Sequence, residues 1–312
     1  MKIVGLVAGK NESARLAYCL RALAPVVDAI VYLDDNSSDD TVDQAKALAK
    51  DCHIERIIER EDPGRDEARD RNLLLRAGRE LGGTCFLVLD VDEAFAASTL
   101  EGARCALETL RPGEALSVPW THLWRSASQY RVDPCIWVGN RRIIAFGDDS
   151  YAWYPNRFLH VPRVPIQGGA HAFPSEVILL HFQFICWPNV LIKQTWYKFL
   201  ERIRTGRTAR DLNHQYDQAL DEIGVRTVPS SPAWFFPFFR EADWMVLYQW
   251  RVDEMRRWRE QHGSLLDGLS VCPRSIRLPW LRSWRNGDGS TRAVLNFRQR
   301  YQSQGKPSKM AC

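Results

Sequence analysis

The sequence lacks several features that mark special classes of protein. Its eight cysteines include no CxxC pair and no regular spacing. Neither a zinc cluster nor a disulfide framework is therefore expected, and reduced thiols in a cytoplasmic protein are the simpler account. No apolar run reaches the roughly 18 residues of a membrane span. The first apolar stretch meets Lys10 and Glu12 too early for a signal peptide.

The composition is that of a folded globular protein. The chain has 312 residues, of which 45% are hydrophobic and 26% charged, enough for one large domain or two modest ones. The net charge of +4 is small, so no nucleic-acid partner is expected. The charge is uneven, because the first ninety residues are rich in acids whereas residues 251–300 are strongly basic.

One stretch combines a buried strand with acidic side chains. Residues 85–93 read Cys-Phe-Leu-Val-Leu-Asp-Val-Asp-Glu and follow Gly82 and Gly83. An apolar run of this length predicts a buried strand. Asp90 and Asp92 stand at its carboxyl end, where open α/β sheets bind ligands. Two carboxylates there can hold a divalent cation and, through it, a phosphate group; the alternative is a solvated acidic turn.

The first 92 residues alternate strand and helix patterns. We predict strands at 2–8, 26–33, 53–59 and 86–89, and helices at 14–23, 41–50 and 65–81. This alternation is typical of a parallel, doubly wound sheet. Because the crossovers are right-handed, the acidic turns at Asp34-Asp35 and Asp90-Asp92 should face a common crevice.

The later residues predict a different organisation. After a helix at 100–110, strands are expected at 115–124, 136–146 and 177–185, and helices at 190–205 and 241–262. We predict a catalytic domain at 1–190, divided into halves 1–100 and 101–190. A C-terminal helical extension should follow at 191–312, with a polar tail from Asn286.

Four motifs in order resemble the nucleotide-sugar half of family 2 glycosyltransferases with the GT-A fold. They are the strand and turn from Val4 to Glu12, the aspartate-rich turn 34–41, the pairs Arg71-Asn72 and Ala77-Gly78, and the DXD-type motif of residues 89–93. The resemblance implies an α/β GT-A fold, a Rossmann-like, mostly parallel sheet flanked by helices. It implies an enzyme that moves a sugar from a nucleoside diphosphate-sugar to a hydroxyl acceptor.

The resemblance also implies roles for individual residues. Asp35 matches the aspartate that accepts a hydrogen bond from the base, in a pocket lined by Ala8, Lys10 and Glu12. Arg71 is expected near the pyrophosphate, since a planar cation suits phosphate oxygens. Asp90 would contact the ribose or the metal. Asp92 would bind the Mn²⁺ or Mg²⁺ that stabilises the departing diphosphate. For Asp34, Asp39 and Asp40 we expect only turn and cap contacts.

The second half resembles the family less closely. A late histidine often completes the metal site, which indicates His181, with His171 as the second choice and a core histidine as the alternative role. An inverting transferase also needs a carboxylate base. Glu176 is the first candidate by position, and Asp148 and Asp149 are the others. Asn156 stands where the related Trp-Tyr-Pro-Asp segment has its aspartate.

Two other classes of function stay open. A nucleotidyltransferase uses a related sheet, but residues 9–12 are not the glycine-rich basic loop that it needs. A non-catalytic nucleotide-binding protein would not need the intact Asp35, Asp90 and Asp92. The expected acceptor is a glycan or glycolipid of the cell surface, such as lipopolysaccharide or capsule. The aromatic and arginine-rich residues 234–259 predict a packed helix; a peripheral contact with the inner membrane face is the alternative. The oligomeric state is left open.

Overall fold

The computed structural model describes residues 1–61, 65–165 and 169–270. The chain forms two compact units, one made of Met1–Ile192 with Glu222–Glu254 and the other of Lys193–Asp221 with Met255–Cys312. The first unit contains all the candidate site residues. The tail predicted from Asn286 lies outside the described residues.

The amino-terminal half of the first unit is a parallel sheet. Its strands are β1 (Ile3–Gly9), β2 (Ala29–Asp34), β3 (Ile54–Glu59) and β4 (Cys85–Asp90). They lie in the order β3-β2-β1-β4, and every neighbouring pair is parallel. The strands are connected by α1 (Ser13–Leu23), α2 (Thr41–Leu48) and α3 (Glu67–Glu80). The doubly wound alternation predicted for residues 1–92 is confirmed.

The sheet continues beyond β4 with a mixture of strand directions. Its further strands are β5 (Glu93–Phe95), β6 (Ala115–His122), β8 (Arg141–Gly147), β9 (Ala170–Ala172) and β10 (Leu179–His181). β8 is antiparallel to both β4 and β6, β10 is parallel to β6, and β5 is antiparallel to β10. A small second sheet pairs β7 (Gln129–Arg131) with β11 (Thr227–Pro229). The strand predicted at 177–185 is only three residues long.

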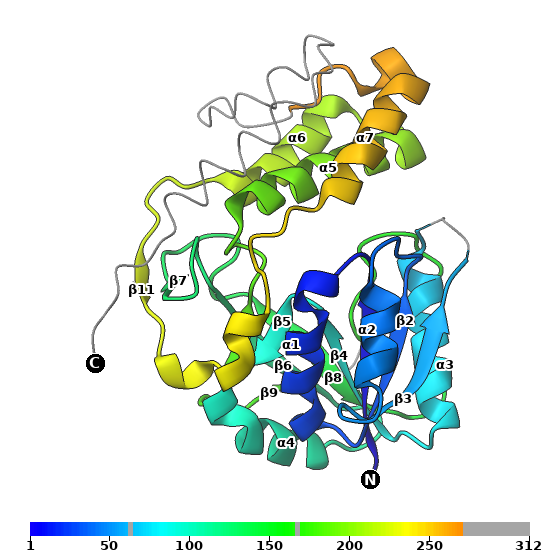
Figure 1. Ribbon diagram of the computed structural model, residues 1–312, viewed down its shortest axis with the longest axis vertical. Coiled ribbons are helices and arrows are strands. Elements are labelled where there is room, and N and C mark those ends of the chain that lie inside the picture. Colours follow the sequence, from blue (N-terminus) through cyan, green and yellow to red (C-terminus); the bar gives the residue numbers. More distant parts are fainter. Residues whose placement is uncertain (62–64, 166–168, 271–312) are drawn as a thin grey trace. The chain divides into compact units, whose positions relative to one another are not determined.

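Helices flank the sheet (Figure 1), and a hydrophobic cluster lies on each of its faces. On one face, side chains of α1, α2 and α4 (Leu100–Glu108) pack with alternate residues of the central strands, such as Ile30 and Leu87. On the other face, α3 packs on the intervening residues, such as Val31 and Phe86. Alternation of side chains across a strand explains why neighbouring residues belong to different clusters. The result is the predicted mostly parallel α/β sheet flanked by helices.

The helical residues near the C-terminus depart from the predicted pattern. The helices are α5 (Trp187–Thr205), α6 (Ala209–Asp217) and α7 (Gln249–His262). The helix predicted at 241–262 therefore begins eight residues later than expected. Residues 243–248 are held by side chains instead, since Asn189 donates to the carbonyl of Val246 at 2.8 Å and accepts from the amide of Tyr248 at 2.9 Å. In the part of the chain described, no helix is both long and apolar enough to cross a membrane.

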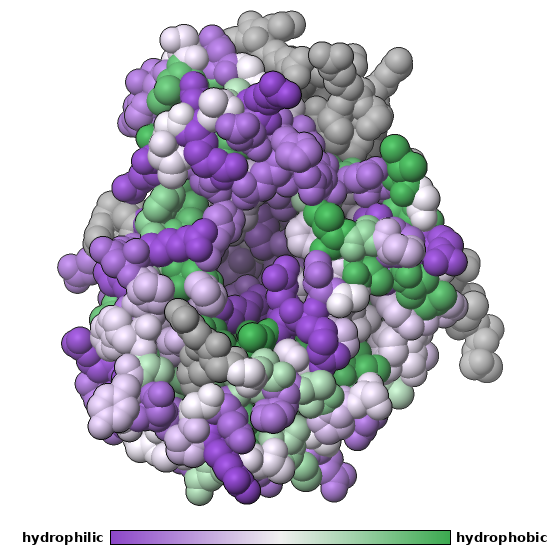
Figure 2. Space-filling view, turned by 180° about the vertical axis from the view of Figure 1, so that it is seen from behind, coloured by the Kyte–Doolittle hydropathy of each residue, from purple (hydrophilic) through white to green (hydrophobic). Residues whose placement is uncertain are grey.

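The aromatic residues among 234–239 are partly buried and pack against the core of the first unit. The ring of Tyr18 on α1 makes edge contacts with Phe236, Phe238, Phe239 and Trp244, at centroid distances of 5.3 to 6.1 Å. This agrees with the packing interpretation of these residues. On the face shown in Figure 2, hydrophilic residues predominate and strongly hydrophobic ones form separate patches.

Candidate active site

The carboxyl ends of the four parallel strands meet at one edge of the sheet. Gly9 at the end of β1 is in register with Asp34 of β2, and Ala8 is in register with Asp90 of β4. Asp35 directly follows β2, and its amide donates to the carbonyl of Gly9 at 2.8 Å. The structure thus brings Ala8, Asp35 and Asp90 to the common edge, although 55 residues separate the two aspartates in the sequence.

The aspartate-rich turn contains both structural and candidate ligand-binding carboxylates. Asp34 accepts hydrogen bonds from the amide and hydroxyl of Ser37 at 2.7 and 2.6 Å, and Asp39 accepts from Thr41 and Ser13. These are the predicted turn contacts. Asp35 instead accepts from buried Arg60 at 2.5 Å. One carboxylate oxygen of Asp35 is therefore fixed in place by a cation.

Arg60 also holds a second buried carboxylate. It donates to Asp70 on α3 at 3.0 Å. Burial raises the pKa of Asp70 to about 6, although Arg60 opposes the shift. Arg60 thus links the end of β2 to the start of α3 through Asp35 and Asp70.

The raised pKa of Asp70 predicts a pH-dependent stability. Because the folded pKa of about 6 exceeds the ordinary value of about 3.9, protonation stabilises the folded chain. That stabilisation is present below about pH 4 and is lost as the pH rises through 6. Relative to Asp70→Asn, the wild type should lose on the order of 2 kcal/mol of unfolding free energy across this range. Urea unfolding at several pH values measures it. Glu80→Gln, at an exposed position of the same helix, keeps Asp70 and should lose stability across this range as the wild type does; an equal loss in Asp70→Asn would contradict the assignment.

A buried arginine neutralises part of the acidic end of β4. Arg163 donates to Glu93 at 2.5 and 2.9 Å and to Asp90 at 2.6 Å. The Glu93 side chain is fully buried, whereas that of Asp90 is half exposed. Glu93 also accepts from the indole N–H of Trp120 at 2.5 Å. Glu93 is thereby a structural anchor for Arg163, and Asp90 keeps a solvent-facing side.

Asp92 faces a histidine from the neighbouring part of the sheet. The Nε2 atom of His181 lies 3.6 Å from Oδ2 of Asp92. His181 is in register with Glu93 of β5 on one side and with His122 of β6 on the other. The Nδ1 atoms of the two histidines are 3.0 Å apart. Burial, and then the neighbouring His181, lower the pKa of His122 well below its ordinary range.

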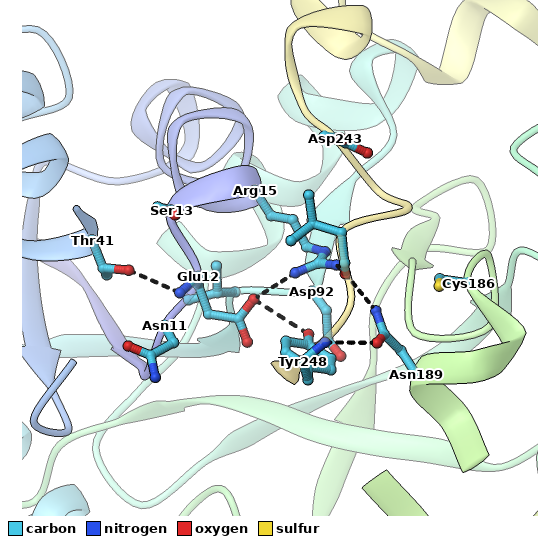
Figure 3. Close-up of polar contacts among 12 residues, drawn as sticks. Asn11, Glu12, Ser13, Arg15, Thr41, Asp92, Cys186, Asn189, Asp243 and Tyr248 are labelled. Atoms are coloured by element: carbon cyan, nitrogen blue, oxygen red, sulfur yellow. Dashed lines mark hydrogen bonds and ion pairs between the residues drawn. The ribbon is translucent and has the colours of Figure 1, made fainter. Parts of the chain in front are cut away.

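Glu12 lies in a buried polar cluster at the start of α1 (Figure 3). Its carboxylate accepts from Arg15 at 3.3 Å and from the hydroxyl of Tyr248 at 3.3 Å. Arg15 also donates to the carbonyl of Val246 at 2.6 Å. Burial raises the pKa of Tyr248 far above its ordinary range, so its hydroxyl stays protonated. Figure 3 shows Tyr248 beside Asp92.

The two predicted cationic residues occupy different elements. Lys10, in the turn after β1, lies over the ring of Trp250 with 5.3 Å from Nζ to the ring centroid. Arg71 is on the second turn of α3, with its guanidinium 6.0 Å from the ring centroid of Tyr154. The hydroxyl of Tyr154 donates to the carbonyl of Arg163 at 2.6 Å, so this ring also supports the arginine that holds Asp90.

The structure does not bring the predicted base candidates to Asp92. Gly147, two residues before Asp149, pairs with Cys85 at the amino end of β4, about 16 Å along that strand from Asp90. Asp149 there accepts from the amides of Tyr151 and Ala152 in a turn. Glu176 is exposed next to Gly102 of α4. Sequence position indicated both residues, but neither is assigned to the site.

The two histidine candidates also separate in space. His171 of β9 is in register with Leu116 of β6, whereas His181 is in register with His122. Six residues of strand β6, about 20 Å, lie between these points. Only His181 reaches the DXD-type motif.

Two side chains near the DXD-type motif could bind a metal ion. Within residues 1–61, 65–165 and 169–270, no three histidine, cysteine or acidic side chains form a group that could hold a metal ion. Asp92 and His181 present one oxygen and one nitrogen 3.6 Å apart. Mn²⁺ and Mg²⁺ commonly take one or two protein ligands and complete their coordination with phosphate and water. The pair fits an ion bound together with a diphosphate, not an ion held by protein alone.

Residues 6–118 match the family model described as Glycosyl transferase family 2. The match covers β2 to β4 and the end of β1, the aspartate-rich turn and the DXD-type motif. The predicted resemblance to family 2 glycosyltransferases is confirmed over these residues, and the sheet described above agrees with the predicted fold class. A search of the curated proteins gives no match.

The solved structures that match this chain have low sequence identity and low TM-scores. S. aureus TarS is 14% identical with a TM-score of 0.44, and the match covers 71% of this chain and 42% of that chain. The mannosyltransferase PcManGT from Pyrobaculum calidifontis, in complex with GDP-Man and Mn²⁺, is 14% identical with a TM-score of 0.43. That match covers 97% of this chain and 82% of that chain. The present chain thus spans less than half of the TarS chain, and scores this low carry no argument about substrate.

Sequence reasoning missed four residues around the site. They are Arg60, His122, Arg163 and Tyr248. Arg163 carries a weak signal, because Pro162 and Pro165 lie on either side of Arg163-Val164 and restrict the backbone there. The other three contact the site through strand register or through distant segments, and no local pattern marks them.

Proposed function

We propose that this enzyme transfers a sugar, with inversion, from a nucleoside diphosphate-sugar to a hydroxyl acceptor, with help from Mn²⁺ or Mg²⁺. One observation carries the proposal. Asp35, Asp90 and Asp92 share the carboxyl edge of the sheet, each beside a different partner: Arg60, Arg163 and His181. Open α/β sheets bind nucleotides at this edge. These carboxylates extend from the end of β2 to the end of β4. This arrangement suits a nucleobase at the β2 end and a diphosphate at the β4 end.

Different residues at this edge would bind the nucleobase, the ribose and the diphosphate of the donor. Asp35, with one oxygen fixed by Arg60, presents a carboxylate to a ring N–H of uracil, guanine or thymine. Asp90, which is half exposed, would accept from a ribose hydroxyl or join the metal site. Asp92 and His181 would hold the metal ion, which when bound offsets the negative charge of the departing diphosphate. Arg71 stays our candidate for a phosphate contact from α3.

We infer that the acceptor is a glycan or glycolipid of the cell surface, reached by a cytoplasmic enzyme at the inner membrane face. The resemblance to family 2 supports this part of the proposal. Residues 6–118, which match the family, hold the donor-side carboxylates; the acceptor would come from the side of residues 119–190.

The reaction class is tested by product analysis. The enzyme is incubated with UDP-, GDP- and dTDP-sugars in the presence of Mn²⁺ or Mg²⁺, and released nucleoside diphosphate is measured. We expect slow donor hydrolysis with one base and a matching thermal shift, since ligand stabilisation grows with concentration over Kd. Formation of pyrophosphate from a nucleoside triphosphate and a sugar phosphate would show a nucleotidyltransferase. Binding without any turnover would favour the non-catalytic alternative.

Asp35→Asn is expected to weaken nucleoside diphosphate binding by roughly 10- to 100-fold. This is the loss expected from removing a hydrogen bond to a charged group, which contributes about 1.5 to 3 kcal/mol. Asparagine can still accept from Arg60 through its oxygen, but its amide N–H₂ cannot accept from the base. Calorimetric titration with UDP, GDP and dTDP measures the change. Asp43→Asn, at an exposed position of α2, is the control; equal losses in both variants would contradict the role of Asp35.

A further inference from the structure

Two buried imidazoles face each other between β6 and β10. The Nδ1 atoms of His122 and His181 are 3.0 Å apart, and the two residues are 0% and 3% exposed. A hydrogen bond between two identical ring atoms requires an N–H on one and a lone pair on the other. The neighbours of each ring decide which histidine donates.

The surroundings of His122 fix its own tautomer. Its Nε2 lies 3.1 Å from the carbonyl oxygen of Trp137, which can only accept, so Nε2 carries a hydrogen. The rings of Trp120, Trp137 and Phe184 surround His122 at centroid distances of 5.2 to 5.8 Å. A second ring proton would place a positive charge inside this aromatic shell, which is costly without a carboxylate partner. The Nδ1 atom of His122 is therefore the acceptor.

The tautomer of His181 follows from that of His122. Its Nδ1 must carry the hydrogen, and its Nε2 then holds a lone pair when the ring is neutral. This Nε2 lies 3.6 Å from Oδ2 of Asp92, beyond hydrogen-bonding distance. Trp120 stacks on the same ring at 4.5 Å and 18°, which fixes its plane.

We propose that His122 is a positioning residue that locks His181 in the Nδ1–H tautomer and directs its Nε2 lone pair toward Asp92. The proposal rests on the proposed function, because the lone pair serves to bind the metal ion beside Asp92. Metal-ligating histidines commonly donate their other ring N–H to a neighbouring group, which sets both tautomer and ring orientation. Here that neighbour is a second histidine on the adjacent strand, which would act through His181 and not as a ligand of the metal.

The tautomer can be measured without metal or substrate. Long-range proton–nitrogen correlation spectra of the full chain, labelled with ¹⁵N-histidine and recorded metal-free above about pH 8, distinguish protonated from unprotonated ring nitrogens, and His181→Gln assigns the signals. We expect a protonated Nδ1 and an unprotonated Nε2 for His181. A protonated Nε2 in the wild type overturns the proposal, and this spectrum decides even where a variant fails to fold.

Two substitutions test whether the tautomer of His181 depends on His122. His122→Phe keeps an aromatic ring but removes the acceptor, so His181 should lose its single tautomer. His122→Asn restores an acceptor near the Nδ1 position and should retain it. An unchanged His181 spectrum in folded His122→Phe would overturn the proposal.

Metal affinity supplies a second readout. Mn²⁺ is titrated, with UDP, GDP or dTDP present, and followed by electron paramagnetic resonance. His122→Phe should weaken Mn²⁺ binding by roughly 10- to 100-fold, and His122→Asn far less. His171→Phe, at an exposed position, is the matched control and should bind as the wild type does. A wild type with the expected tautomer but no bound Mn²⁺ would overturn the metal part of the proposed function while the tautomer assignment stands.

Discussion

Replacing Asp92 by alanine should lower sugar transfer on the order of a thousandfold. A metal ion contributes several kcal/mol of charge stabilisation to a transition state, and about 4 kcal/mol corresponds to a factor of a thousand. Asp92 is the acidic side chain that faces His181, with 3.6 Å between Oδ2 and Nε2, so its loss should remove half of the proposed protein ligand set. The loss should appear mainly in kcat, and the stabilisation of bound nucleoside diphosphate by Mn²⁺ should disappear.

The control for Asp92 is a second aspartate on the same side of the sheet. Asp40 is exposed in the aspartate-rich turn, and its side chain makes no capping hydrogen bond to α2. Asp40→Ala should therefore keep activity within about twofold, as surface substitutions usually do. Asp92→Asn keeps the side-chain shape and separates loss of charge from loss of packing. Full activity in Asp92→Ala, with Mn²⁺-dependent binding retained, would contradict the assignment.

Replacing Arg163 by alanine should destabilise the folded chain by about 3 to 5 kcal/mol, the cost of leaving a buried carboxylate without its cation. The carboxylate is that of Glu93, which is fully buried and bound by Arg163 through both oxygens. Donor binding should weaken as well, because Asp90 loses the same partner. Urea unfolding gives the stability change, and titration with nucleoside diphosphate gives the affinity.

Two further variants separate charge from packing at Arg163. Arg157→Ala removes an exposed arginine from the same loop and should change stability by less than about 0.5 kcal/mol. Arg163→Met combined with Glu93→Gln removes both charges and should recover much of the lost stability. A double variant as unstable as Arg163→Ala would show that packing, not the buried charge, explains the effect.

The donor half of the fold was predictable because its signals are local. Apolar runs of four to eight residues, separated by helical patterns and turn residues, are confirmed as the parallel strands β1 to β4. Right-handed crossovers then require Asp35 and Asp90 to share an edge. The predicted helix at 241–262 was wrong over residues 241–248, because Asn189 binds backbone groups there that a helix would have used itself.

The sequence by itself determined the parallel sheet of the donor half and its resemblance to family 2 glycosyltransferases, since four ordered motifs and the alternation of strands require only local chemistry. Tertiary structure alone decided which side chains surround those motifs. It placed His181 at Asp92 and His171 at the far end of β6, because register along a strand converts six residues into about 20 Å. It also brought Arg163, His122 and Tyr248 to the site from separate segments. Such pairings depend on strand register and on long-range packing, which leave no periodic trace in the sequence.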